Sequence, residues 1–254
     1  MSNVVRHMDD PRNWIIFNGK DLRDFSVYCN GTDTYNAPEH EYETITIPGR
    51  NGEFKRDMRR FQQIVVPYNC WIATNFDTNM KNLREYMLSV DGYAVLKDTY
   101  HPNTYRKAIF EGPIEVSPAI GLSFGSFTLS FNCKPERWLL SGDNAVTISS
   151  TGTTLTNETK YVSRPTLKLI GHGMITVTNG SWSYNITVAA NDYENTEYTI
   201  DTERLIAISG SGANMNQYVT PSDRDNWALL KPGNNIVNYT GFTSVKIIPR
   251  WWTI

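Results

Sequence analysis

Histidine, the usual general base and metal ligand, is scarce in this chain of 254 residues. The histidines are scattered, without the short spacing that a zinc site requires: His7, His40, His101 and His172. The segment Ser209-Gly210-Ser211-Gly212 is typical of a flexible turn and not of the nucleophile elbow of serine hydrolases. We therefore expect no catalytic residues, no metal and no cofactor, and a protein that is not an enzyme.

Cysteine is equally sparse, and long apolar runs are missing. Cys29, Cys70 and Cys133 are an odd number of widely spaced cysteines, which suits a reducing cytosol better than a disulfide framework. We expect three buried thiols. The first ten residues contain no apolar signal core, and no run approaches the ~18 apolar residues of a membrane-spanning helix. The sequence thus predicts a soluble protein, made in the cytoplasm, with no membrane-spanning segment.

An excess of charge of one sign is also missing. Lysine and arginine number 24 against 26 aspartates and glutamates, and the formal net charge is −2. Such a balance lacks the basic surface that attracts nucleic acid from a distance. We therefore expect no sequence-specific binding to DNA.

The residues that are abundant favour strands. Aromatic residues make up 12% of the chain, and tyrosine, asparagine and threonine are frequent. Trp14–Phe17 followed by Asn18-Gly19 predicts a strand and a tight turn, with Phe25–Cys29 as the second strand. One helix is expected from an N-cap at Asp77 to about Ser89, with its apolar stripe formed by Met80, Leu83, Met87 and Leu88.

Turn residues and alternating segments divide the chain into two β-rich domains. After Trp138, short strands recur at intervals of about ten residues, which is typical of a β-sandwich. The segments 166–170 and 173–177 are two of these strands, and 244–249 is the last. We expect an N-terminal domain over residues 1–138 and a C-terminal β-sandwich over residues 139–254.

An acidic strand and a basic stretch stand close together in the first domain. Residues 39–47 alternate with a period of two and place three carboxylates on one side: Glu39, Glu41 and Glu43. The basic side chains follow the Pro48-Gly49 turn: Arg50, Lys55, Arg56, Arg59 and Arg60. We expect a basic loop that pairs with the acidic strand of a neighbouring subunit, because a head-to-tail ring needs two complementary faces on each copy. A solvated loop and a contact with DNA in a channel are the alternatives.

Aromatic side chains in the second domain permit two interpretations. Trp182, Tyr184 and Trp251 could form a flat platform for sugars. Large aromatic residues are more often part of a core or an interface. Trp251 and Trp252 are adjacent, so in a strand they point to opposite sides, and we expect at least one of them to be exposed or at an interface.

Several short pieces, in order, resemble the distal tail proteins (Dit) of long-tailed bacteriophages. The pieces are Phe17-Asn18-Gly19-Lys20-Asp21-Leu22, Pro48-Gly49-Arg50-Asn51-Gly52, Tyr100-His101-Pro102-Asn103 and Cys133-Lys134-Pro135. The resemblance covers roughly residues 10–138, and the second half resembles the family only in size and β character. It implies an N-terminal β-barrel-like or sandwich-like ring domain with one helix, and a peripheral β-sandwich like galectins or carbohydrate-binding modules.

The resemblance also implies a function. The family builds a hexameric ring at the virion tail tip, which connects the tail tube protein to tail-tip, tail-fibre or receptor-binding proteins. Phage DNA passes through its lumen, and the protein is made in the cytoplasm of the host bacterium. A carbohydrate-binding adhesion module of a phage or bacterial surface assembly is the alternative, and a wall-degrading enzyme is the third hypothesis.

Overall fold

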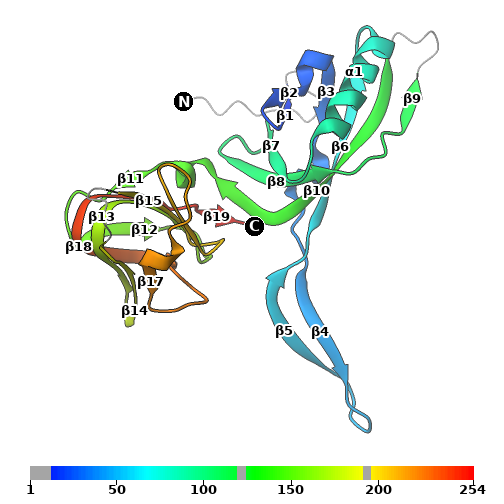
Figure 1. The fold of residues 1–254 in the computed structure, drawn as a ribbon. Helices are drawn as coiled ribbons and strands as arrows, with labels where there is room; N and C mark the ends of the chain where they lie inside the picture. Colours follow the sequence, from blue (N-terminus) through cyan, green and yellow to red (C-terminus); the bar gives the residue numbers. More distant parts are fainter. Residues whose placement is uncertain (1–12, 119–123, 191–195) are drawn as a thin grey trace, which may run out of the picture. The chain divides into compact units, whose positions relative to one another are not determined.

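The protein is mainly β and divides into two compact units. The computed structural model describes residues 13–118, 124–190 and 196–254 (Figure 1). One α-helix occurs among these residues and the remaining elements are strands and short 3-10 helices, which confirms the expected fold class. The division falls between Arg137 and Trp138, and the first unit also takes in Ile254. Each unit has its own hydrophobic core.

A nine-stranded sheet supports the first unit. Strands β2, β1, β7, β8, β10, β6 and β3 lie side by side in that order, and β9 also pairs with β10, as does β19, whose residues belong to the second unit. The bounds are β1 (Ile15–Phe17), β2 (Lys20–Asp21), β3 (Val27–Asn30), β6 (Ile64–Ile72), β7 (Ala94–Asp98), β8 (Thr104–Phe110), β9 (Val116–Pro118), β10 (Gly125–Leu139) and β19 (Trp252–Thr253). Burial alternates along β6 and along β10 as far as Cys133, so every second side chain of these segments enters the core.

The first turn of the chain joins a different pair of strands from the one expected. Asn18 and Gly19 both have positive φ, at 47° and 79°, as a tight two-residue turn requires. β1 pairs through this turn with the short strand β2, and β3 pairs with β6 instead. The expected partnership of Trp14–Phe17 with Phe25–Cys29 is therefore wrong. The reason is the 3-10 helix η1 (Leu22–Phe25), whose first turn is capped by Asp21 and which redirects the chain.

Helix α1 (Phe76–Ser89) covers the first core (Figure 1). Phe76, Met80, Leu83 and Met87 are its buried residues. Leu88, expected in the same stripe, is 66% exposed, because it lies one residue, or about 100°, around the helix from Met87. The expected N-cap is also wrong, since the N-cap residue is Asn75 and Asp77 lies in the first turn.

The second unit contains an eight-stranded sheet. Its strands pair in the order β11, β18, β13, β14 and β17, while β12 pairs with β18 and β15 pairs with both β13 and β16. The bounds are β11 (Val146–Thr147), β12 (Thr153–Asn157), β13 (Thr166–Asn179), β14 (Trp182–Val188), β15 (Glu197–Asp201), β16 (Ile206–Ser209), β17 (Val219–Pro221) and β18 (Gly233–Ile248). The 3-10 helices η3 (Leu140–Asp143) and η4 (Asn216–Tyr218) complete the unit.

A bend in two long strands shapes the second unit. β13 and β18 pair from end to end, with register shifts at Gly171 and before Met174. The first half of β13 pairs with β15 and its second half with β14. Segments 166–170 and 173–177, which were expected to be separate strands, are therefore two halves of one strand. Gly173 and Gly241 permit the bend, because their backbones approach one another too closely for any side chain.

Candidate assembly surface

The hairpin arm, formed by β4, β5 and the turn between them, is the most exposed element of the first unit. β4 (His40–Thr46) and β5 (Glu53–Phe61) form a separate two-stranded sheet, which stands away from the nine-stranded sheet in Figure 1. The acidic strand expected over residues 39–47 is thus present. The prediction of a loop for the basic stretch is wrong, because these residues form β5, the strand that pairs with β4.

Acidic and basic side chains pair within the hairpin arm. Arg60 donates two hydrogen bonds to Glu41, with Nε 2.8 Å from Oε2 and Nη2 2.7 Å from Oε1. Arg56 Nη1 lies 3.5 Å from Glu43 Oε2. The hydrogen bonds from Arg60 lower the pKa of Glu41, and the same bonds raise the pKa of Arg60. Glu41 and Glu43 therefore have partners within one chain, whereas the sequence predicted partners on a neighbouring subunit.

The remaining candidate charges of the arm point to solvent. Within the described part of the chain, no ion pair joins the side chains of Glu39, Arg50, Lys55 or Arg59. Arg59 has a positive φ of 56°, and its backbone N–H donates to Asp57 Oδ1 at 2.6 Å. Arg59 therefore belongs to a bulge in β5, which shifts the register between β4 and β5 at the position between His40 and Tyr42. These four side chains remain available to another molecule.

Large apolar side chains also lie exposed along the arm. Phe54 is 58% exposed and Tyr42 is 50% exposed. Ile45 lies directly opposite Phe54, and both are exposed, so they form an apolar pair near the turn. The exposed apolar residues of the arm are Tyr42, Ile45, Ile47, Phe54 and Met58. Exposed apolar side chains that gather on one element are typical of contact sites with other proteins, so the arm is the candidate assembly surface.

Both strands of the arm keep one unpaired edge. Among the described residues, β4 pairs only with β5 and β5 only with β4. A two-stranded hairpin has marginal stability in water, and its free N–H and C=O groups are a template for strand addition. The arm can therefore add a further strand along either edge, with its charged and apolar side chains deciding which strand fits.

A buried polar network fixes the root of the arm. Tyr68 donates its hydroxyl to Asp98 Oδ2 at 2.7 Å, and the backbone N–H of His101 donates to Asp98 Oδ1 at 2.8 Å. Arg137 Nη2 donates at 2.6 Å to the carbonyl oxygen of Thr34, in the 3-10 helix η2 (Thr32–Tyr35) that precedes β4. Burial lowers the pKa of Arg137, and burial followed by the charge of Arg137 lowers the pKa of His101.

A polar hollow of about 700 Å³ lies on the outer face of β6 and β10. Its lining residues include Asn69, Glu115, Ser126, Thr128 and Ser130. Thr128 donates to Asn69 across the two strands at 3.2 Å. The hollow is open to solvent, and its lining contains neither a histidine nor more than one carboxylate.

Burial separates the aromatic side chains of the second unit that were considered as a sugar platform. Tyr184 is only 4% exposed, so it is a core residue and cannot bind a sugar. Trp182 and Trp251 are half-buried and pack against the second core, and Lys231 Nζ lies 4.2 Å from the centre of the Trp182 ring. The aromatic pair that sequence reasoning missed is Tyr161 with Trp252, whose rings stack at 4.3 Å. No local pattern in the sequence predicts this pair, because the two residues are far apart along the chain.

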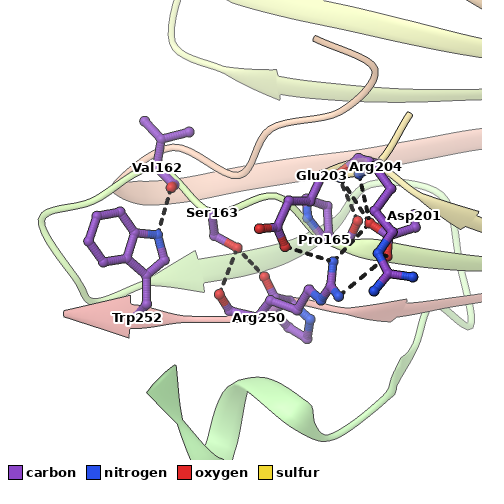
Figure 2. Close-up of polar contacts among 10 residues, drawn as sticks. Val162, Ser163, Pro165, Asp201, Glu203, Arg204, Arg250 and Trp252 are labelled. Atoms are coloured by element: carbon purple, nitrogen blue, oxygen red, sulfur yellow. Dashed lines mark hydrogen bonds and ion pairs between the residues drawn. The ribbon is translucent and has the colours of Figure 1, made fainter. Parts of the chain in front are cut away.

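A second polar centre holds the last segment of the second unit (Figure 2). Asp201 accepts hydrogen bonds from Arg250 Nη1 at 3.0 Å and from the backbone N–H groups of Glu203 and Arg204 at 3.0 and 3.1 Å. Burial of this carboxyl opposes ionisation, but these hydrogen bonds and the Arg250 charge outweigh it, and the pKa of Asp201 is lowered. Ser163 donates to the carbonyl oxygens of Pro249 and Arg250, and Trp252 Nε1 donates to Val162.

Metal-ligating side chains do not gather in the described part of the chain. No three histidine, cysteine, aspartate or glutamate side chains there lie close enough together to hold a metal ion. The described helices include none with the length and apolar character to cross a membrane.

Comparisons with known proteins show the fold. No protein-family model matches the sequence, and no curated protein is significantly similar to it. The solved structure of the SPP1 Dit protein, described as a paradigm of the hub adsorption apparatus in phages that infect Gram-positive bacteria, superposes with a TM-score of 0.71 at 16% identity. That comparison covers 95% of this chain and 99% of the SPP1 chain.

Two structures of the phage P2 baseplate in its activated conformation are also similar. The structure with Ca gives a TM-score of 0.52 and the structure with Sr gives 0.53, both at 9% identity. Each comparison covers 92% of this chain and 97% of the baseplate chain. The chain therefore has the fold of the SPP1 Dit protein, and the expected resemblance in fold to the distal tail proteins is confirmed.

Proposed function

We propose that this chain is a structural hub protein of a phage tail tip, without catalytic activity, and that it acts as a ring of six copies. The fold of the SPP1 Dit protein supports the hub role, since that protein is described as part of a hub adsorption apparatus. The baseplate chains of phage P2 support a place in the virion tail. The protein is made in the cytoplasm of the host bacterium and is then built into the tail.

The hairpin arm is the observation that carries this proposal. Its two free strand edges and its exposed apolar side chains are unsatisfied in a single copy. Pairing of the β4 edge of one copy with the β5 edge of the next satisfies both edges at once. Such a contact is heterologous, and a heterologous contact closes into a ring when the rotation between copies permits it.

The charge of the arm suits a channel through which DNA passes without being held. Residues 39–60 contain five acidic and five basic side chains, which cancel. Two of the basic ones, Arg56 and Arg60, are already paired with glutamates. Affinity for DNA comes mainly from unpaired cations that neutralise phosphates, so an arm of this composition binds DNA weakly and without sequence preference.

The ring has two faces and a periphery, to which we assign the partners. One face contacts the tail tube protein, and the opposite face contacts the tail-tip or tail-fibre protein. The second unit is peripheral and offers a surface to receptor-binding proteins. In this arrangement the second unit does not need to bind sugar in order to serve the hub.

Native mass spectrometry of the purified full chain tests the proposal. We expect a hexamer, with electron microscopy showing closed rings. A variant in which residues 40–61 are replaced by a short Gly/Ser linker should remain folded but monomeric, because His40 and Phe61 are paired neighbours that such a linker can join. Rings that persist without the arm would contradict its role in assembly. Monomers of the intact chain at high concentration, with tail tube protein present, would contradict the ring itself.

A further inference from the structure

Two of the three cysteines lie directly opposite one another in the first unit. Cys29 on β3 pairs in register with Cys70 on β6, so both side chains leave the sheet on the same face. Both are buried in the first core, at 1% and 2% exposure. Cys133, the third cysteine, is equally buried, but Ile64 lies opposite it on β6.

The register places the two cysteines within reach of a disulfide. Directly opposite residues of an antiparallel pair have Cα atoms about 4.5 to 5.5 Å apart. That separation falls within the range of about 4.4 to 6.8 Å over which disulfides occur. The carbonyl oxygen of Cys29 accepts a hydrogen bond from the Tyr100 hydroxyl at 3.3 Å.

We propose that Cys29 and Cys70 are a disulfide site, which is reduced when the protein is made and closes when the protein meets a small-molecule disulfide such as oxidised glutathione. The thiolate of one cysteine attacks the small disulfide, forms a mixed disulfide and releases one small thiolate. The thiolate of the second cysteine then attacks the protein sulfur of the mixed disulfide and releases the other. Two protein thiols lose two electrons and two protons, and one small disulfide becomes two thiols.

The position of β3 gives the oxidant a route to the buried sulfurs. β3 is the last strand in the sheet order, and no strand from the described residues lies along its outer edge. Burial raises the pKa of the Cys29 thiol to about 12 and raises the pKa of Cys70 well above its usual value. The thiolates are therefore rare while the strand is in place, and the reaction proceeds through local opening of β3 and accelerates as pH rises.

The bond would close a loop that contains the whole hairpin arm. β3 leads through η2 into β4, and β5 leads back into β6. A disulfide between β3 and β6 therefore fixes both ends of the arm at its root, while leaving its charged and apolar surface unchanged. This effect does not depend on ring formation, and it can be measured on a monomer.

The test is a redox titration of the purified full chain in glutathione buffers of decreasing reduced fraction, with sub-denaturing urea to allow strand opening. Thiols are then counted in denatured protein. We expect the count to fall from three to one, and peptide mapping without reductant to give a single linked species joining the peptides of Cys29 and Cys70. The oxidised protein should melt at a higher temperature than the reduced protein.

Cys133 provides the matched control, because the pKa of its thiol is also raised to about 12 by burial. The Cys133→Ser variant should lose both of its thiols, whereas Cys29→Ser and Cys70→Ser should each retain two or form only glutathione adducts. If either variant fails to fold, the peptide map of the unmodified chain decides alone. Three thiols at the oxidising end of the titration, or a linked peptide containing Cys133, would overturn the proposal.

Discussion

Arg250 and Asp201 meet in a two-pronged ion pair, with Nη1 3.0 Å and Nη2 3.4 Å from the two carboxylate oxygens, although they lie 49 positions apart in the sequence. Replacement of Asp201 by asparagine should destabilise the second unit by about 1.5–3 kcal/mol, the usual worth of hydrogen bonds to a charged group. Asp223 is the control, because it also accepts backbone hydrogen bonds but contacts no arginine in the described structure. Urea unfolding followed by hydrogen exchange should show less than half the effect for Asp223→Asn.

The same ion pair predicts a dependence on pH. The pKa of Asp201 is lower in the folded protein than in the unfolded chain, so its contribution to stability is complete above the unfolded value of about 4. That contribution is lost as pH falls through the lower, folded value. The melting temperature of the second unit should therefore fall steeply below about pH 4, and this fall should be shallower in Asp201→Asn. Equal slopes for the two proteins would contradict this assignment.

Loss of the Tyr68 hydroxyl should weaken the root of the hairpin arm. Tyr68→Phe leaves the buried Asp98 without one donor, and an unsatisfied buried group of this kind costs about 1–3 kcal/mol. Tyr35→Phe is the matched control, because Tyr35 is 65% exposed and its ring contact with His101 survives the change. The free energy of unfolding of the first unit measures the difference, which should exceed that of the control several-fold.

Charge reversal on the arm should weaken subunit association. Arg59→Glu with Arg60→Glu converts a balanced arm into a strongly acidic one, so adjacent copies repel each other while each remains folded. Adding Glu41→Lys restores an ion pair with the new residue at 60 and should recover part of the assembly. Sedimentation velocity at low protein concentration measures both changes.

A charge-neutral swap separates the two possible causes. Glu41→Arg combined with Arg60→Glu keeps the pair within one chain and leaves the net charge of the arm unaltered. It should assemble as the unmodified protein does. If the double arginine reversal sediments unchanged, the charges of the arm take no part in association, and strand pairing alone must account for it.

The bend of the second unit should be intolerant of a side chain. A Cβ at Gly173 would overlap the carbonyl oxygen of Thr240, and the φ of 149° is itself unfavourable for alanine. Gly173→Ala should therefore cost about 3 kcal/mol or more, as severe overpacking does. Gly212 has a φ of 86° with open space around it, so Gly212→Ala should cost only about 1 kcal/mol. Thermal melting of the two variants compares them.

No glycan should bind tightly to the second unit. Tyr184 is buried, and the face of the Trp182 ring is covered by Lys231, so the residues first considered as a platform leave little flat surface. A glycan array with the full chain measures this. A specific hit that disappears in Trp182→Ala or Trp251→Ala, with the fold retained, would favour the adhesion function over the hub.

Local patterns in the sequence predicted the elements better than their partners. The Asn18-Gly19 turn, the helix up to Ser89 and the strand after Glu39 depend on neighbouring residues, and each is present. The partner of the first strand could not be predicted, because the interposed η1 depends on a cap by Asp21 that competes with strand pairing. Two strands separated by the bend at Gly173 looked independent, because glycines commonly end strands.

The candidate site was predicted as a list of residues but not as a geometry. The charges of the arm stand out in the sequence, yet the pairing of Glu41 with Arg60 follows only from the register of β4 and β5, which a bulge at Arg59 displaces. The opposition of Cys29 and Cys70 also depends on register, between strands that enclose the whole arm. A one-residue slip would place these two thiols on opposite faces.

The two ends of the second unit are joined by their own backbone. The N–H of Leu139 donates to the carbonyl oxygen of Trp251 at 2.9 Å, and the N–H of Arg250 donates to that of Gly142 at 2.8 Å. The first and last residues of the second unit therefore lie side by side, so the unit could be exchanged as a whole. Any compact domain whose termini lie side by side could be grafted between residues 139 and 251 without lengthening a linker, so an enzyme or a binding domain could take the place of this unit.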